Sequence, residues 1–140
     1  MKEMVFTFLG AVGAAIAAAF GGWTPALTTL VILMCADYVT GVMIAAIFKK
    51  SPKSKLGGVD SAVGFMGLCK KFVILFFVLV AVLLDRIMGT TYLKDVVCIA
   101  YIINELVSLI ENAGLMGVPI PAPIVSAVDI LKQRSGESKP

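Results

Sequence analysis

Residues 26–48 of the chain read ALTTLVILMCADYVTGVMIAAIF and contain a single charged residue, Asp37. An apolar segment of this length can cross about 30 Å of hydrocarbon as an α-helix. A carboxylate near the middle of such a helix is costly in lipid, so it normally faces protein or water. Asp37 is therefore either a functional acid within the membrane or an interhelical contact whose charge snorkels to water or is neutralised by a proton.

The composition of the whole chain agrees with a membrane location. Of its 140 residues, 59% are hydrophobic and 15% are charged, whereas soluble domains have about 45–50% and about 25%. The net charge of +3 is too small and too localised for a nucleic-acid-binding surface. The chain has no histidine, and its three cysteines lie far apart in apolar stretches. The sequence therefore predicts no metal site, no cofactor and no enzymatic activity.

The first apolar segment, residues 4–21, is rich in small residues that recur every four positions. They share one helix face, which lets another helix approach closely in a membrane. This helix-packing face consists of Gly10, Gly13, Ala14, Ala17, Ala18 and Gly21. Two alternatives are that the small residues merely fill a weak span, or that the segment is a signal peptide cleaved after the A-x-A pattern at residues 17–19. We favour the association face.

The basic residues between the second and third apolar segments predict the topology. They are Lys49, Lys50, Lys53, Lys55, Lys70 and Lys71. By the positive-inside rule, this region is cytoplasmic and contacts anionic lipid. We place the third span at residues 66–88, after an interfacial segment at residues 59–68, and expect Lys70 and Lys71 to snorkel toward the cytoplasmic interface.

The fourth apolar segment, residues 96–112, is amphipathic. At 100° per residue, its polar side chains fall within an arc of about 120°. This polar stripe consists of Tyr101, Asn104, Glu105, Ser108, Glu111 and Asn112. The stripe lines an aqueous pathway in an oligomer, forms a hydrogen-bonded seam between subunits, or lies flat on the membrane. Interfacial helices usually carry lysine or arginine on their polar face, and this stripe has neither, which disfavours the third interpretation.

Together, these segments predict an all-α integral membrane protein with both termini in the cytoplasm. We expect four transmembrane helices, at residues 4–21, 25–48, 66–88 and 96–112. The alternative is three spans plus an interfacial helix, which would leave the basic tail outside the cell. The single membrane domain covers residues 1–132 and ends in an amphipathic segment at residues 121–132. Residues 133–140 are expected to form a polar, flexible tail.

Four motifs of the chain, taken together, resemble those of a known protein family. They are DYVTG at residues 37–41, GLCKK at 67–71, NELVSLIEN at 104–112 and GVPIP at 117–121. Over roughly residues 25–125, this combination resembles the toxin-secretion/phage-lysis holin family of phages and prophages of Gram-positive bacteria. The sequence departs from the family pattern at residues 57–61, where a GGVD run is inserted.

The resemblance implies a multi-pass protein of the bacterial cytoplasmic membrane that forms homo-oligomers and opens non-specific lesions during host lysis. The lesions release an endolysin, the functional partner, or large toxins, and an antiholin is a possible regulator. Two other functions remain open: a small dimeric multidrug exporter or ion channel in which Asp37 couples protons, and an antiholin-like accessory subunit. Because so small a chain cannot enclose a wide passage alone, many copies would have to present the polar stripe of residues 101–112.

Overall fold

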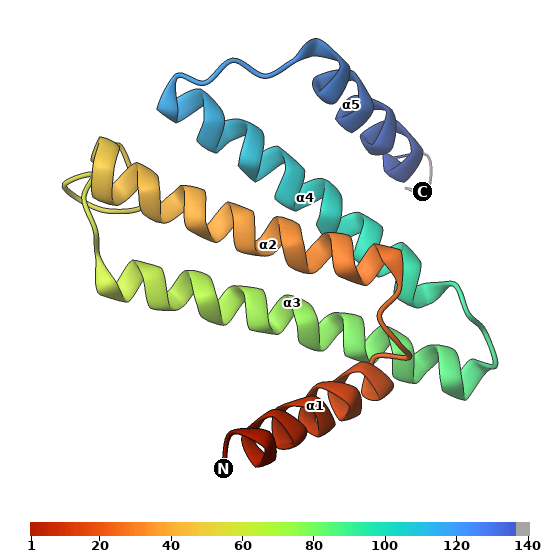
Figure 1. The fold of residues 1–140 in the computed structure, drawn as a ribbon. Coiled ribbons are helices and arrows are strands. Elements are labelled where there is room, and N and C mark those ends of the chain that lie inside the picture. The colour runs from red at the N-terminus through yellow and green to blue at the C-terminus, as the bar shows by residue number, and fades with distance from the viewer. Residues whose placement is uncertain (137–140) are drawn as a thin grey trace.

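The computed structural model describes residues 1–136, with side chains to residue 134, and contains only helices within that range. These are five α-helices and one short π-helix, which extends the second α-helix. Figure 1 shows how the α-helices are arranged. Their bounds are α1 Lys2–Ala19, α2 Pro25–Met43, η1 Ile44–Phe48, α3 Ser61–Met88, α4 Leu93–Met116 and α5 Ala122–Gly136. The predicted all-helical fold is confirmed for the described residues.

Local sequence signals explain where the helices begin and end. The Thr24 hydroxyl accepts a hydrogen bond from the backbone of α2, and Pro25 occupies the first helical position, where its missing N–H costs nothing. The Asp60 carboxylate caps α3 in the same way. Gly89 and Gly117 end α3 and α4 with φ of 67° and 76°, a left-handed conformation that favours glycine.

Two expected boundaries differ from the structure. The separate interfacial segment at residues 59–68 does not form, because the Asp60 cap starts one continuous helix that runs to Met88. The amphipathic segment expected at residues 121–132 continues as α5 to Gly136, so the first part of the expected tail is helical. The remainder of that tail, residues 137–140, lies outside the described residues.

The helix with the most polar stripe, α4, lies at the centre of the bundle. It packs closely against both α2 and α3, whereas α2 and α3 run alongside each other but approach less closely. The buried core consists of Leu27, Leu30, Met34, Val78, Cys98 and Ile102. The short helix α5 folds back onto α4 and buries Val128. The polar stripe on α4 therefore lies beside a dry apolar core.

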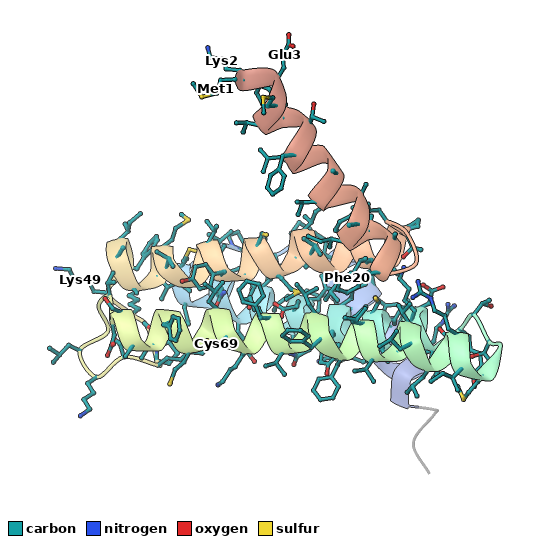
Figure 2. All side chains as sticks on the ribbon, turned by 90° about the horizontal axis from the view of Figure 1, so that it is seen from below. Met1, Lys2, Glu3, Phe20, Lys49 and Cys69 are labelled. Atoms are coloured by element: carbon teal, nitrogen blue, oxygen red, sulfur yellow. The ribbon has the colours of Figure 1, made fainter. Side chains whose placement is uncertain are left out.

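Helix α1 stands apart from the other helices. Figure 2 shows it projecting away from the α2–α3–α4 bundle, and none of its residues is buried. Only its C-terminal end is tied to the bundle, because Arg86 Nη2 donates to the Ala18 carbonyl at 2.9 Å. The apolar side chains of α1 are exposed in the protomer, as expected for a helix that faces lipid or another copy.

Three helices are long and apolar enough to cross a membrane: α1, α2 together with η1, and α3. Many large apolar side chains on them are exposed, which a water-soluble protein of this size would not tolerate. The chain is therefore a membrane protein. Helix α4 is not among the three, so a fourth span at residues 96–112 stays a prediction.

The connections between helices gather at two ends of the bundle. The α1–α2 and α3–α4 connections lie together at one end, whereas the lysine-rich loop of residues 49–60 lies at the other (Figure 1). The labelled Lys49 and Phe20 mark these opposite ends in Figure 2. This grouping is the one that the predicted topology requires, and which end faces the cytoplasm stays a prediction.

Candidate functional site

A lysine joins two acids from different helices in the interior of the bundle. The Lys71 Nζ atom of α3 lies 2.9 Å from Asp37 Oδ2 of α2. It also lies 3.0 Å and 3.2 Å from the two carboxylate oxygens of Glu105 on α4. One ammonium group therefore links three helices that are far apart in the sequence.

An amide and a hydroxyl extend this network. The Asn112 Nδ2 atom donates to Asp37 Oδ1 at 3.0 Å and to Thr40 Oγ1 at 2.8 Å. Thr40 in turn donates to the backbone of its own helix at Ala36. We call the five residues Asp37, Thr40, Lys71, Glu105 and Asn112 the Lys71 cluster. Within it, Asp37 has two side-chain donors, whereas Glu105 has only Lys71.

The charges of the Lys71 cluster are largely withdrawn from solvent. The side chains of Lys71, Asp37 and Glu105 are 15%, 18% and 3% exposed. A charge in such surroundings is costly unless it is paired and hydrogen-bonded. These groups are paired only while the three helices stay together. The charges of the cluster therefore depend on the arrangement of the helices.

A cavity of about 580 Å³ leads from the Lys71 cluster to the lysine-rich loop. Beside the cluster, its lining includes the polar residues Tyr38, Asn104, Ser108, Glu111, Lys70, Ser51, Lys53, Ser54 and Asp60. A cavity of this size, lined by apolar as well as polar residues, is large enough to hold several water molecules. Beyond the cluster, in the direction of Cys98, the interior is the dry apolar core. Water can therefore approach the cluster from the loop end.

The structure divides the predicted polar stripe of α4 among three environments. Glu105 and Asn112 belong to the Lys71 cluster, and Tyr101 packs against the apolar core. Asn104 and Glu111 are exposed at the cavity, with Ser108 half-buried beside them. The stripe is thus not one open polar face in the protomer, because its 120° arc is wide enough to reach both α2 and the cavity.

The structure agrees with one of the two interpretations of Asp37 and differs from the expectation for Lys71. Of the two interpretations of Asp37, the structure places it in an interhelical contact. Lys71, expected to snorkel toward the interface, instead bonds to two acids inside the bundle, because these offer closer partners than water does. Its neighbour Lys70 has no ion pair among the described residues and lines the cavity. The one signal for this pairing was that isolated acids and bases in membrane helices tend to pair.

The remaining predicted residues are not brought to this site. The loop lysines Lys49, Lys50, Lys53 and Lys55 lie at the loop end, where Lys53 reaches the cavity lining. Within the predicted helix-packing face, Gly10 and Gly13 are unoccupied in the protomer, since a methyl group added at either would meet nothing within 4 Å. Gly21 was wrongly assigned to this face: it lies beyond the end of α1 in a left-handed turn, close to Val82 and Lys94. Association through that face, and the topological role of the lysines, stay predictions.

A second polar group, which sequence reasoning missed, fastens the opposite end of the bundle. The Asp85 carboxylate accepts hydrogen bonds from the Thr90 hydroxyl and from the backbone N–H groups of Leu93 and Lys94. The Lys94 ammonium group donates to the Gly22 carbonyl at 2.9 Å. We call Asp85, Arg86, Thr90 and Lys94 the turn cluster. It caps the start of α4, where free N–H groups favour an anion.

The chain matches a known protein family over most of its length. The model described as the bacteriophage holin family matches residues 14–133. These residues include α2, α3, α4, the Lys71 cluster and the turn cluster.

Several bacterial proteins are similar to the chain over most of both lengths. An uncharacterized 14.9 kDa protein in the nagH 3′ region of Clostridium perfringens is 38% identical over 117 residues, which are 82% of this chain and 83% of that protein. An uncharacterized protein of Halalkalibacterium halodurans is 32% identical over 138 residues, 94% and 96% of the two chains. Another, of Listeria monocytogenes, is 34% identical over 111 residues, 79% and 74% of the two chains. No solved structure matches.

Proposed function

This chain belongs to the bacteriophage holin family, whose members form membrane pores and are not enzymes, and on this premise we propose that it is a holin of the bacterial cytoplasmic membrane. Copies of the chain oligomerise in that membrane and form non-specific lesions. The lesions release an endolysin or large toxins during host lysis. The endolysin needs no stable contact with the chain for this, because passage through the lesion is sufficient.

The strongest support is the position of the charged and amide side chains within an otherwise apolar protein. The protomer has a dry core around Cys98 and Ile102, so it offers no passage of its own. A wide lesion must therefore form between copies, and its wall needs polar side chains. Helix α4 supplies them: Asn104 and Glu111 are already exposed, and Glu105 and Asn112 lie on adjacent positions of the same helix.

We further propose four spans, with both termini and the lysine-rich loop in the cytoplasm. The positions of the connections support this arrangement, because both short connections lie at one end of the bundle and the lysine-rich loop lies at the other. Labelling of single cysteines placed at residues 23, 55 and 91 with a membrane-impermeant reagent tests it. We expect labelling from outside at residues 23 and 91 only. Labelling of residue 55 from outside would reverse the proposed orientation.

Expression in a bacterium tests the function itself. We expect an abrupt loss of membrane potential after a delay, and lysis only when an endolysin is expressed in the same cells. The endolysin expressed alone is the control and should leave the cells intact. Cells that accumulate the chain in the membrane without depolarising would contradict the proposal. Substrate-dependent proton uptake by liposomes containing the chain would instead support the exporter.

A further inference from the structure

Resting on this proposed function, we infer that Lys71 is a clamp that keeps the protomer closed before lesions form. In the closed state, Lys71 holds α2 and α4 together with α3 through Asp37 and Glu105. Release of Lys71 is the conformational step that frees Glu105 and lets the polar side of α4 rearrange to line a lesion. The clamp thus separates an accumulating form of the protein from a lesion-forming one.

The first step is that two polar residues of the α4 stripe, Glu105 and Asn112, are bonded within the closed protomer. The Glu105 side chain is only 3% exposed, with both of its oxygens directed to Lys71. Asn112 donates to Asp37 and Thr40. Both side chains border the cavity, but neither can turn outward to a passage between copies of the chain while these bonds persist. A lesion lined by the α4 stripe therefore requires a different arrangement of the bundle.

The second step is that Lys71 is the polar link between α3 and α4 at the loop end of the bundle. Side-chain hydrogen bonds between these two helices occur at only two places within the described residues: Lys71 with Glu105, and the turn around Asp85. When Lys71 is released, the turn at Asp85 still joins the helices. Helix α3 can then move away from α4 at the loop end while the opposite end stays fastened.

The third step is that the clamp can open without stranding charges in a dry interior. The 580 Å³ cavity reaches the Lys71 cluster from the lysine-rich loop. Water in this cavity can hydrate the ammonium and carboxylate groups as they separate, which lowers the cost of breaking a buried ion pair. The cluster also carries two carboxylates for one ammonium group, so the pairing is not balanced. These features suit a contact that holds and then releases.

The timing of depolarisation tests the clamp. We expect Lys71→Met to shorten the delay at least about twofold, because the closed form loses one partner of a buried ion pair. Such a loss costs more than ~1.4 kcal/mol, which is enough to change the ratio of closed to open protein tenfold. Lys70→Met removes the same charge from the adjacent position, which has no ion pair within the described part of the chain, and should keep the wild-type delay. Lys71→Arg should also stay close to wild type. An unchanged delay in Lys71→Met at equal membrane levels would overturn the clamp.

A second measurement does not depend on lysis or on the accumulation of Lys71→Met. Ile102 is buried in the apolar core about one helical turn from Glu105, and Ile102→Cys serves as the probe in a parent in which Cys35→Ser, Cys69→Ser and Cys98→Ala remove the native thiols. In inverted membrane vesicles, we expect a water-soluble thiol reagent to label this cysteine at least about tenfold faster in Glu105→Gln than in the parent, because weakening the clamp by ~1.4 kcal/mol is sufficient.

Equal labelling of the two proteins would overturn the clamp, even if wild-type cells depolarise and lyse as proposed. Faster labelling in Glu105→Gln, together with cells that never depolarise, would support the clamp and contradict the holin function. Lys70→Met is again the matched control and should label as slowly as the parent. The two hypotheses therefore fail in distinguishable ways.

Discussion

The two polar groups of the bundle are built from similar residues but make different kinds of bonds. In the turn cluster, Asp85 and Lys94 bond chiefly to backbone groups at nearby helix ends. In the Lys71 cluster, the bonds run from side chain to side chain between three helices. The first group fastens the end with two short connections, and the second lies next to the cavity at the loop end.

This difference in bonding indicates which charged groups can exchange partners. A carboxylate that accepts from the first N–H groups of a helix satisfies donors that have no other partner, so this bond persists as long as the helix does. An ion pair between two flexible side chains can be replaced by water or by another ion once water reaches it. We therefore expect the turn cluster to be structural and the Lys71 cluster to be the movable part of the molecule.

The largest loss of stability is expected when Glu105 becomes leucine. Lys71 then keeps only Asp37, and the free energy of unfolding in detergent micelles should fall by about 2 kcal/mol, since a hydrogen-bonded charge at a buried site is lost. Glu111→Leu on the exposed side of the same helix is the matched control and should change it by less than about 0.5 kcal/mol. Equal losses for both variants would show that the stripe acts as one surface and that the cluster is not special.

A smaller loss is expected at the other end of the bundle from Lys94→Met. The methionine keeps the length of the buried side chain but leaves the Gly22 carbonyl without its donor. The loss should be about 1–1.5 kcal/mol, the usual contribution of one hydrogen bond. The exposed neighbour provides the control, Asp95→Asn, which should have little effect. Because Lys94 lies outside the Lys71 cluster, Lys94→Met should not shorten the delay before depolarisation. A shortened delay would remove the functional distinction between the two ends.

The sequence was sufficient to predict most of the helices, because the length of an apolar segment and the positions of glycine and proline decide where a membrane helix forms, but it did not predict the start of α3 at Ser61. The second span at residues 25–48 matches α2 and η1, and the first span matches α1 within a few residues. The matched family was also predictable from the motifs of residues 37–41 and 104–112. These features are local in the sequence.

The contacts between helices were not predictable in the same way. Lys70 and Lys71 look equivalent in the sequence, but they are 100° apart on a helix, and only Lys71 faces the acids. Helical periodicity places Glu105 on the polar side of α4 but cannot say which residues of α2 and α3 lie opposite. The packing of α4 between two apolar helices decides that, and it depends on the whole bundle.

The next prediction concerns a neutral member of the Lys71 cluster. Asn112→Ala removes the donor to Asp37 Oδ1 and Thr40 Oγ1 but leaves the ion pairs in place. We expect a loss of about 1 kcal/mol in the free energy of unfolding. Asn104→Ala, which removes an exposed amide from the same helix, should have almost no effect or a slightly stabilising one, because alanine has the higher helix propensity. A loss as large as that of Glu105→Leu would mean that the amide, rather than Lys71, holds α2 to α4.

The smallest change in stability is expected from Arg86→Ala. This variant tests whether the attachment of α1 is independent of the packing of the other helices. Arg86 is exposed, and within the described residues its side chain donates one hydrogen bond, to the Ala18 carbonyl at the C-terminal end of α1. The free energy of unfolding should therefore change by less than about 0.5 kcal/mol. Amide hydrogens at residues 17–22 should nevertheless exchange faster, while those around Glu105 should not, because α1 has no buried residue to hold it.

Arg86→Lys, which keeps a donor, is the control. Faster exchange around Glu105 as well would mean that α1 and the Lys71 cluster move together. In that case, a change at either end of the molecule could open the clamp.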